Sequence, residues 1–247
     1  MLDMALPPLC PVCREAVGSA GLCTSCFDKL RLITAPYCQS CGRPLPYLLP
    51  DGHCGRCFID PPPLRHIRAA TQYNAASRNL ILPFKHAGRI QMAAPLSQIM
   101  VPELHRLVQP DHIIIPIPLH WRRLLMRRFN QSGEMAERLY QQLRRNHQTS
   151  LPYMKTDLSD FRVSYGPHML RRKRHTKSLR GQSARMRETI LRHAFQVPEK
   201  YQTDISGRPV LLIDDVMTTG ATLYSAARCL QKAGSGPVDA LVFARVL

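Results

Sequence analysis

Four Cys-x-x-Cys pairs lie within the first 57 residues of the 247-residue chain and constrain its fold more than any other feature. The pairs are Cys10/Cys13, Cys23/Cys26, Cys38/Cys41 and Cys54/Cys57. Two thiolates separated by two residues can face one ion from a tight turn, and two such pairs complete a tetrahedral shell. We therefore predict two structural Zn²⁺ sites, the first four cysteines holding one ion and the last four the other.

Disulfides or a redox pair are the alternative to zinc. The N-terminus lacks the basic segment and apolar core of a secretory signal, and a reducing compartment disfavours disulfides. No apolar run approaches the roughly 20 residues of a membrane-spanning helix, so we expect a soluble, cytoplasmic protein. Sequential and interleaved grouping of the cysteines would use the same ligands, and the spacing leaves both open.

A run of three prolines, Pro61 to Pro63, resists both helix and central strand and predicts a boundary between residues 1–60 and 61–247. Beyond it, apolar segments of strand length alternate with segments of helical period. The expected strands span 67–73, 113–118, 210–213 and 238–245, and the expected helices span 76–84, 92–107, 132–145 and 223–233. This alternation predicts an α/β domain built on a mostly parallel sheet.

The charge is strongly basic, with 34 Lys and Arg against 17 Asp and Glu. Between His120 and His193, 15 arginines and three lysines face five acidic residues. The planar guanidinium suits phosphate oxygens, so a polyanionic partner is indicated: a phosphorylated small molecule, nucleic acid, or both. A solvated basic surface would show the same composition, and charge alone does not choose between them.

The segment 210–223 joins a buried strand to a helix through two carboxylates and a hydroxyl-rich turn. Ligands of open α/β sheets bind at this end of the strands. Gly220 lets backbone approach a ligand, and loop amides at a helix N-terminus favour a phosphate. Asp214 and Asp215 are placed to accept hydrogen bonds from a diol such as ribose. Alternatively, Thr218 caps the helix and the aspartates are a solvated strand end.

This segment resembles the phosphoribosyl-pyrophosphate loop of type I phosphoribosyltransferases: four apolar residues, two acids and a Thr/Gly-rich turn. The resemblance implies that the two aspartates hold the ribose 2′- and 3′-hydroxyls and that the turn holds the 5′-phosphate, with Mg²⁺ accompanying the ligand. The implied binding residues are Asp214, Asp215, Val216, Met217, Thr218, Thr219, Gly220, Ala221 and Thr222.

Three further segments, Tyr73 to Arg89, Ile115 to Ser132 and Thr176 to Phe195, resemble the ComF/GntX family when taken together with the cysteine pairs. The family implies a double zinc ribbon joined to a type I phosphoribosyltransferase-like domain, a mostly parallel sheet with helices on both faces. It also implies handling of incoming single-stranded DNA during natural transformation, with DNA-uptake machinery proteins as candidate partners.

The resemblance also implies a set of phosphate contacts and places a flexible loop in the basic region 147–187, and the basic residues themselves suggest a second set, which would contact DNA. The implied pyrophosphate or phosphate contacts are Lys85, Leu119, His120, Arg171 and Arg174. The candidate DNA contacts are Arg122, Arg123, Arg127, Arg128, Arg172 and Lys173. Trp121 and two other aromatics are available for base stacking. Arg128 stands where the family usually has glycine.

Three functions are compatible with these features. The favoured hypothesis is a DNA-handling protein that retains a phosphoribosyl-pyrophosphate pocket. The second is an active phosphoribosyltransferase, whose acceptor and catalytic residues the sequence does not identify. The third is a sensor that binds phosphoribosyl pyrophosphate and switches DNA or partner binding without chemistry.

Overall fold

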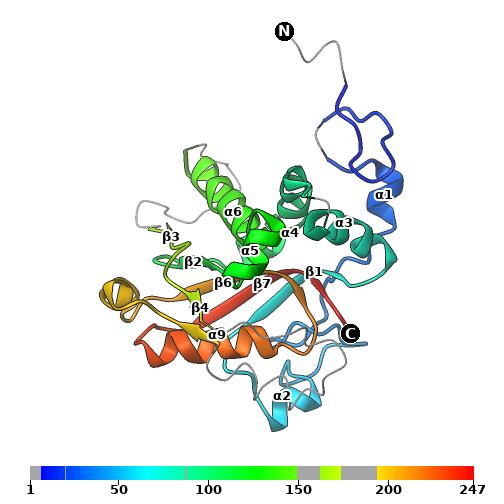
Figure 1. Ribbon diagram of the computed structural model, residues 1–247. Helices are drawn as coiled ribbons and strands as arrows, with labels where there is room; N and C mark the ends of the chain where they lie inside the picture. Colours follow the sequence, from blue (N-terminus) through cyan, green and yellow to red (C-terminus); the bar gives the residue numbers. More distant parts are fainter. Residues whose placement is uncertain (1–6, 20, 87, 149–161, 174–193) are drawn as a thin grey trace.

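A five-stranded, fully parallel sheet forms the centre of the computed structural model, which describes residues 7–19, 21–86, 88–148, 162–173 and 194–247. The strand order is β1-β7-β6-β2-β3 (Figure 1). The strands are β1 (Ile67–Gln72), β2 (Ile113–Pro116), β3 (Ser164–Tyr165), β6 (Val210–Met217) and β7 (Val238–Arg245). The predicted α/β class with a mostly parallel sheet is confirmed.

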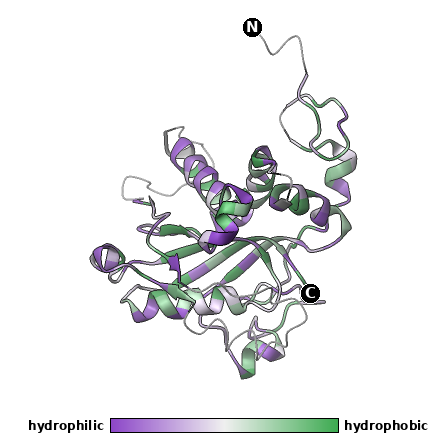
Figure 2. Cartoon of the chain, in the orientation of Figure 1, coloured by the Kyte–Doolittle hydropathy of each residue, from purple (hydrophilic) through white to green (hydrophobic). Residues whose placement is uncertain are grey.

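Helices cover both faces of the sheet (Figure 1). One face carries α3 (Ala75–His86), α4 (Ala93–Leu107) and α6 (Gln131–Gln148), and the other carries α9 (Ala221–Lys232). Successive side chains of a strand point to opposite faces of the sheet. Leu211 therefore packs in the core on the side of α3, α4 and α6, and Leu212 packs in the core on the side of α9. Figure 2 shows hydrophobic residues concentrated along these strands. Central strands buried on both faces need such continuous apolar runs.

Short elements complete the described part of the chain. They are α1 (Thr24–Asp28), α2 (Gly55–Ile59), η2 (Ile90–Met92), α5 (Trp121–Arg127), β4 (Arg171–Arg172), β5 (Phe195–Gln196), η4 (Glu199–Tyr201) and α8 (Gln202–Ile205). Strands β4 and β5 form a separate antiparallel pair. None of the helices within the described ranges is both long enough and apolar enough to cross a membrane.

Two strand ends differ from the sequence-based expectations by at least two residues. Strand β6 continues beyond Ile213 to Met217, because Asp214, Val216 and Met217 keep their register with β7. Strand β2 ends at Pro116 and is followed by α5, a helix that was not predicted from the sequence. No residue of α5 is buried, so this helix has no apolar face toward the core that periodicity could detect.

Residues 31–40 of the cysteine-rich module pack along the outer edge of β1. The Ile33 N–H donates to Ala70 O at 3.0 Å, and the Gln72 N–H donates to Arg31 O at 2.8 Å, so residues 31–33 extend the sheet by a short antiparallel segment. Farther along, the Ile67 N–H donates to Ser40 O at 2.8 Å. These bonds satisfy backbone groups that an edge strand would otherwise expose.

Candidate functional site

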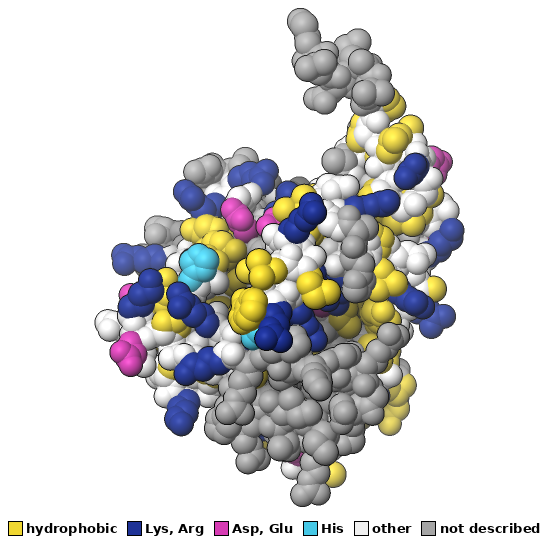
Figure 3. All heavy atoms as spheres, viewed as in Figure 1, with side chains coloured by type: hydrophobic (Ala, Val, Ile, Leu, Met, Phe, Trp, Pro, Cys, Tyr) yellow, Lys and Arg dark blue, Asp and Glu magenta, His cyan; other side chains and the backbone are white. Residues whose placement is uncertain are grey.

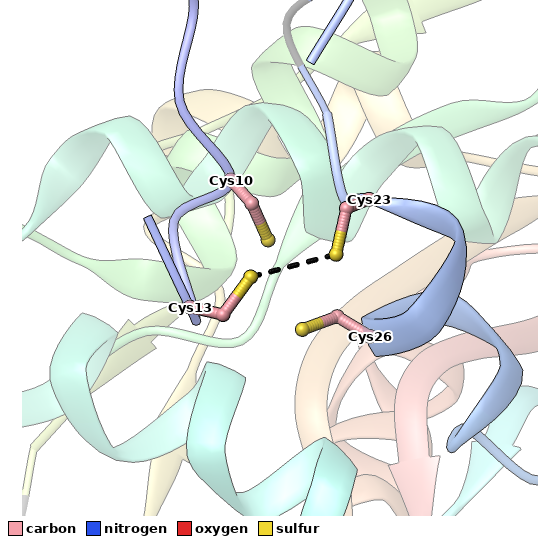
Figure 4. A group of neighbouring side chains, drawn as sticks. All are labelled: Cys10, Cys13, Cys23 and Cys26. Carbon is pink, nitrogen blue, oxygen red and sulfur yellow. Dashed lines mark hydrogen bonds between the residues drawn. The ribbon is translucent and has the colours of Figure 1, made fainter. Parts of the chain in front are cut away.

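The eight predicted ligand cysteines gather in two groups in the sequential order, Cys10–Cys26 and Cys38–Cys57. Within each group the four sulfurs lie within 4.8 Å of one another. Figure 4 shows those of the first group facing a common centre. The Cys13 and Cys23 sulfurs are 3.5 Å apart, and those of Cys41 and Cys54 are 3.8 Å apart. Tetrahedral Zn²⁺ with Zn–S bonds of about 2.3 Å would separate its sulfurs by about 3.8 Å. Both groups therefore fit structural zinc.

The local backbone places the sulfurs in positions from which they can bind a metal ion. Cys23 and Cys54 are the N-caps of the one-turn helices α1 and α2, which place Cys26 and Cys57 on the inward side. In the second group the Cys54 N–H donates to the Cys38 sulfur at 3.3 Å. Burial would raise the pKa of the Cys38 thiol, but backbone N–H groups outweigh burial and lower this pKa to about 6. A thiolate at this position is the form that binds zinc.

Strand β6 brings two adjacent carboxylates to the carboxyl end of the sheet. Asp214 Oδ1 accepts hydrogen bonds from Ser132 Oγ and from the Asp215 N–H, both at 2.9 Å. Asp215 forms an ion pair with Lys85, whose Nζ lies 2.9 Å from each of its carboxylate oxygens. Because Lys85 comes from α3 and Ser132 from α6, the pair joins three separate elements at one point.

Burial, followed by the neighbouring charge of Asp215, raises the pKa of Asp214 to about 7. The Asp215 N–H, Lys85 and Ser132 act in the opposite direction but do not cancel this effect. Asp214 therefore changes charge near neutral pH. Perturbed carboxylates of this kind are concentrated at functional sites.

Three consecutive residues at the start of α6 fix the geometry around the carboxylates. Asn130 Nδ2 donates to Ile117 O at 3.1 Å, and Gln131 Nε2 donates to Phe84 O at 3.2 Å. Ser132, the third residue, holds Asp214. The family resemblance includes this segment but implies no role for it in the site. Its signal in the sequence is three adjacent hydrogen-bonding side chains at the beginning of a helical pattern.

The turn after β6 requires glycine. Gly220, the N-cap of α9, has φ +84°, and a Cβ at this position would lie 2.8 Å from both Met217 Cε and the Tyr224 ring. A glycine N-cap has no side chain to bond the first-turn N–H groups of the 12-residue helix α9. An anion is the natural partner for such groups.

The predicted basic residues fall into two sets, an inward set whose side chains are half-buried and an outward set whose side chains are exposed. Arg172 in β4 is half-buried; burial and then the charge of Arg123 lower its pKa to about 10, with Asp214 opposing. Arg127 is likewise half-buried. The charges of Asp214 and Asp215 raise its pKa, but burial has the larger effect and lowers it. The arginines at positions 123, 127 and 172 therefore belong to the electrostatic surroundings of the carboxylates.

The outward set consists of Arg122, Arg128, Arg171 and Lys173, all of them exposed. Figure 3 shows basic side chains spread over the face of the molecule in view. Among the candidate phosphate contacts, His120 is buried and its Nδ1 caps α5 by accepting from the Arg122 N–H at 3.3 Å. Leu119 is half-buried beside it. Arg174 and, with it, residues 149–161 and 174–187 of the predicted flexible loop region lie outside the described residues.

The fold and the cysteine groups define a double zinc ribbon followed by a parallel α/β domain. The model of the double zinc ribbon domain family matches residues 1–58. The whole chain is similar to DNA utilization protein YhgH of Escherichia coli (strain K12), 30% identical over 99% of this chain and 100% of the relative. Competence protein F of Haemophilus influenzae is 30% identical over 96% of each chain. Competence protein ComFC of Bacillus subtilis is 28% identical over 86% of this chain and 79% of the relative. The chain belongs to the ComF family.

Proposed function

We propose that the chain binds phosphoribosyl pyrophosphate with Mg²⁺ at the carboxyl end of β6 and handles incoming single-stranded DNA during DNA uptake. The main support for the phosphoribosyl-pyrophosphate site is the carboxylate pair of Asp214 and Asp215, which is followed in the chain by the glycine turn and the N-terminus of α9. Carboxylates accept hydrogen bonds from a ribose diol, and the turn at 218–222 suits its 5′-phosphate. Lys85 and the inward arginines supply positive charge for the remaining phosphates.

Titration calorimetry of phosphoribosyl pyrophosphate with Mg²⁺ tests this pocket. The variant Asp214→Asn/Asp215→Asn removes both charges while keeping side-chain size, and we expect it to lose binding. Asp28→Asn/Asp204→Asn, which neutralises two exposed aspartates elsewhere, is the matched control and should bind like the wild type. A wild-type chain without affinity, or equal binding by all three proteins, would refute the pocket.

The outward basic residues and an exposed aromatic support the DNA part of the proposal. Trp121, the single tryptophan of the chain, is 56% exposed, and the Arg122 guanidinium lies 5.2 Å from its ring centroid. Aromatic rings stack with bases and arginines follow the phosphate backbone. The relatives named for DNA utilization and competence point to the same class of ligand.

Fluorescence anisotropy with a labelled single-stranded oligonucleotide tests DNA binding, with tryptophan quenching as a second signal. Arg122→Gln/Arg171→Gln should reduce the slope of log affinity against log salt by about 0.7 for each phosphate that the variant no longer neutralises. Arg78→Gln, an exposed arginine of α3, should leave the slope unchanged. Equal slopes in all variants would mean that single-stranded DNA contacts other residues or does not bind the chain.

The inward arginines also favour the transferase alternative, because guanidinium groups near the ribose site would stabilise a departing pyrophosphate. Pyrophosphate release in the presence of a pool of nucleobases and other acceptors would identify this activity. A change in oligonucleotide affinity on adding phosphoribosyl pyrophosphate, without pyrophosphate release, would instead identify a sensor.

A further inference from the structure

A cavity of about 110 Å³ lies between the second zinc ribbon and the turn that follows β6. The ribbon contributes Cys41, Arg56 and Cys57, and the α/β domain contributes Thr218, Thr219, Tyr224, Arg228 and Arg245. Asp60 and the three prolines of the connecting segment form the remaining wall. A water molecule occupies about 30 Å³ in the liquid, so the cavity has room for a phosphate or carboxylate group.

The cavity is distinct from the carboxylate pair. Lys85 and Ser132, which contact the aspartates, come from α3 and α6 on one face of the sheet. Tyr224, in contrast, belongs to α9 on the opposite face, and Arg245 ends β7, which flanks β6 on the side away from β2. The cavity and the aspartates therefore flank the turn at 218–220 from two sides.

The lining is rich in hydrogen-bond donors. Three arginines, Arg56, Arg228 and Arg245, and a single acidic residue, Asp60, are among the lining residues. Arg245 is held in place because its Nη1 donates to Cys41 O and lies 3.9 Å from Met217 Sδ. Its buried Nε has no hydrogen-bond partner among the described residues. Tyr224 adds a phenolic hydroxyl, which can donate a hydrogen bond at neutral pH.

Neutralisation of the metal centre is the competing explanation for these arginines. A zinc ion with four thiolates has a formal charge of 2−, and two of the ligand cysteines line the cavity. The hydrogen bond from Arg245, however, is accepted by the carbonyl oxygen of Cys41 and not by a sulfur. Arg56 is exposed and extends the donor surface toward solvent. The arrangement thus has donors beyond those that contact the ribbon.

We propose that this cavity binds a small oxyanion, a phosphate or carboxylate group, and that the second zinc ribbon supplies Arg56 as one of its ligands. Arginine presents a planar pair of donors that matches both groups. The ribbon then contributes directly to a binding site in addition to stabilising the fold. The cavity shares Thr218 and Thr219 with the turn proposed to hold the 5′-phosphate, but its three arginines, Arg56, Arg228 and Arg245, have no role in the phosphoribosyl-pyrophosphate proposal.

Calorimetric titration of the zinc-loaded full-length chain with inorganic phosphate, and separately with malonate, tests the proposal. We expect one of the two probes to bind the wild type and Arg56→Gln to weaken that binding about 10-fold, as for loss of a charge-assisted hydrogen bond. The better probe distinguishes phosphate from carboxylate. Arg43→Gln, an exposed arginine on the same ribbon, is the control and should bind like the wild type.

Zinc release to a chelator separates the two explanations for Arg56. Unchanged release by Arg56→Gln, together with weakened anion binding, supports the oxyanion site. Faster release with the same anion affinity as Arg43→Gln, or no binding of either probe to the wild type, overturns it. Asp214→Asn/Asp215→Asn should retain the Arg56-dependent binding. Loss of that binding in the aspartate variant would assign the anion to the carboxylate site and refute a separate pocket.

Discussion

Asp239 and His112 meet inside the amino end of the sheet, where His112 Nε2 lies 3.2 Å from Asp239 Oδ2 and both side chains are fully buried. His112 Nδ1 accepts from the Gln109 N–H at 2.7 Å, which places the imidazole proton on Nε2, facing the carboxylate. Arg65 adds two donors to the same carboxylate, and the His66 N–H adds a third. The carboxylate therefore fastens β7 to the segments that precede β1 and β2.

Replacing Asp239 by Asn should destabilise the fold by about 3 kcal/mol at pH 7, because it leaves the Arg65 charge without its partner. Burial would raise the pKa of Asp239, but the bonds from His112 and Arg65 lower it to about 2. The stabilisation is thus present above the unfolded pKa near 4 and is lost as the pH falls toward 2. Urea unfolding at pH 7 measures the effect, and a loss below 1 kcal/mol would contradict it.

Asp214→Asn should stabilise the chain at neutral and alkaline pH. The folded pKa near 7 exceeds the unfolded value, so the wild type loses stability as the pH rises from about 4 to 7. Asparagine keeps an oxygen to accept from Ser132 but carries no charge. Since Asp214 is half-buried, we expect a gain of about 2 kcal/mol at pH 8 and almost none at pH 4. Parallel pH profiles of unfolding free energy for the two proteins would rule this out.

Gly220→Ala should destabilise the turn more than Gly207→Ala does. Both glycines have positive φ, +84° and +66°, but no described atom lies within 4 Å of a Cβ placed at Gly207. We expect about 1 kcal/mol for backbone strain alone at Gly207 and about 2–4 kcal/mol at Gly220, where a clash is added. Thermal unfolding of the two variants measures the difference. Equal losses would mean that Met217 and Tyr224 move aside without resistance.

Arg128→Gly should stabilise the chain by about 0.5–1 kcal/mol. Arg128 is the C-cap of α5 and has φ +68°, a left-handed conformation that glycine adopts without strain. Arg128→Ala removes the same charge but keeps the strain, so it should produce no gain. Denaturant unfolding of both variants against the wild type provides the comparison, and a gain from alanine equal to that from glycine would attribute the effect to charge.

Gly42→Ala should loosen the second ribbon from the sheet. A Cβ at Gly42 would lie 2.3 Å from Ile67 O, which is backbone of β1 and cannot move without disturbing the strand. Gly55, on the same ribbon, has open space and provides the control. We expect faster zinc release to a chelator from Gly42→Ala and an unchanged rate from Gly55→Ala. The same rate in both variants would show that docking on β1 does not protect this metal site.

The parallel sheet and the cysteine groups could be predicted because each has a local signal. The apolar run at 113–115 and the segment 238–245 contain few polar residues, and their strand positions follow from that pattern. The end of β6 could not be placed in the same way. Asp214 and Asp215 have the polarity of a loop, and only pairing with β7 keeps them in the strand.

Side-chain direction was the second feature that could not be predicted from the sequence. Arg171 and Arg172 are adjacent and chemically identical, yet β4 exposes the first and half-buries the second near Asp214. Asp239 has a usable signal in the sequence, because it is the lone polar residue between Val238 and Ala244. Such a residue in a buried strand needs charged partners, and these came from residues 65 and 112, far away in the chain.

Strand β7, formed by residues 238–245, lies between β1 and β6 in the interior of the sheet. During synthesis the ribosome therefore makes the element that unites the two sides of this sheet after the four other strands described in it. Until it emerges, β1 together with the second zinc ribbon packed on it has no strand linking it to β6. A nascent chain thus holds a metal-binding half and a carboxylate-bearing half that become one folded unit only when translation reaches this strand.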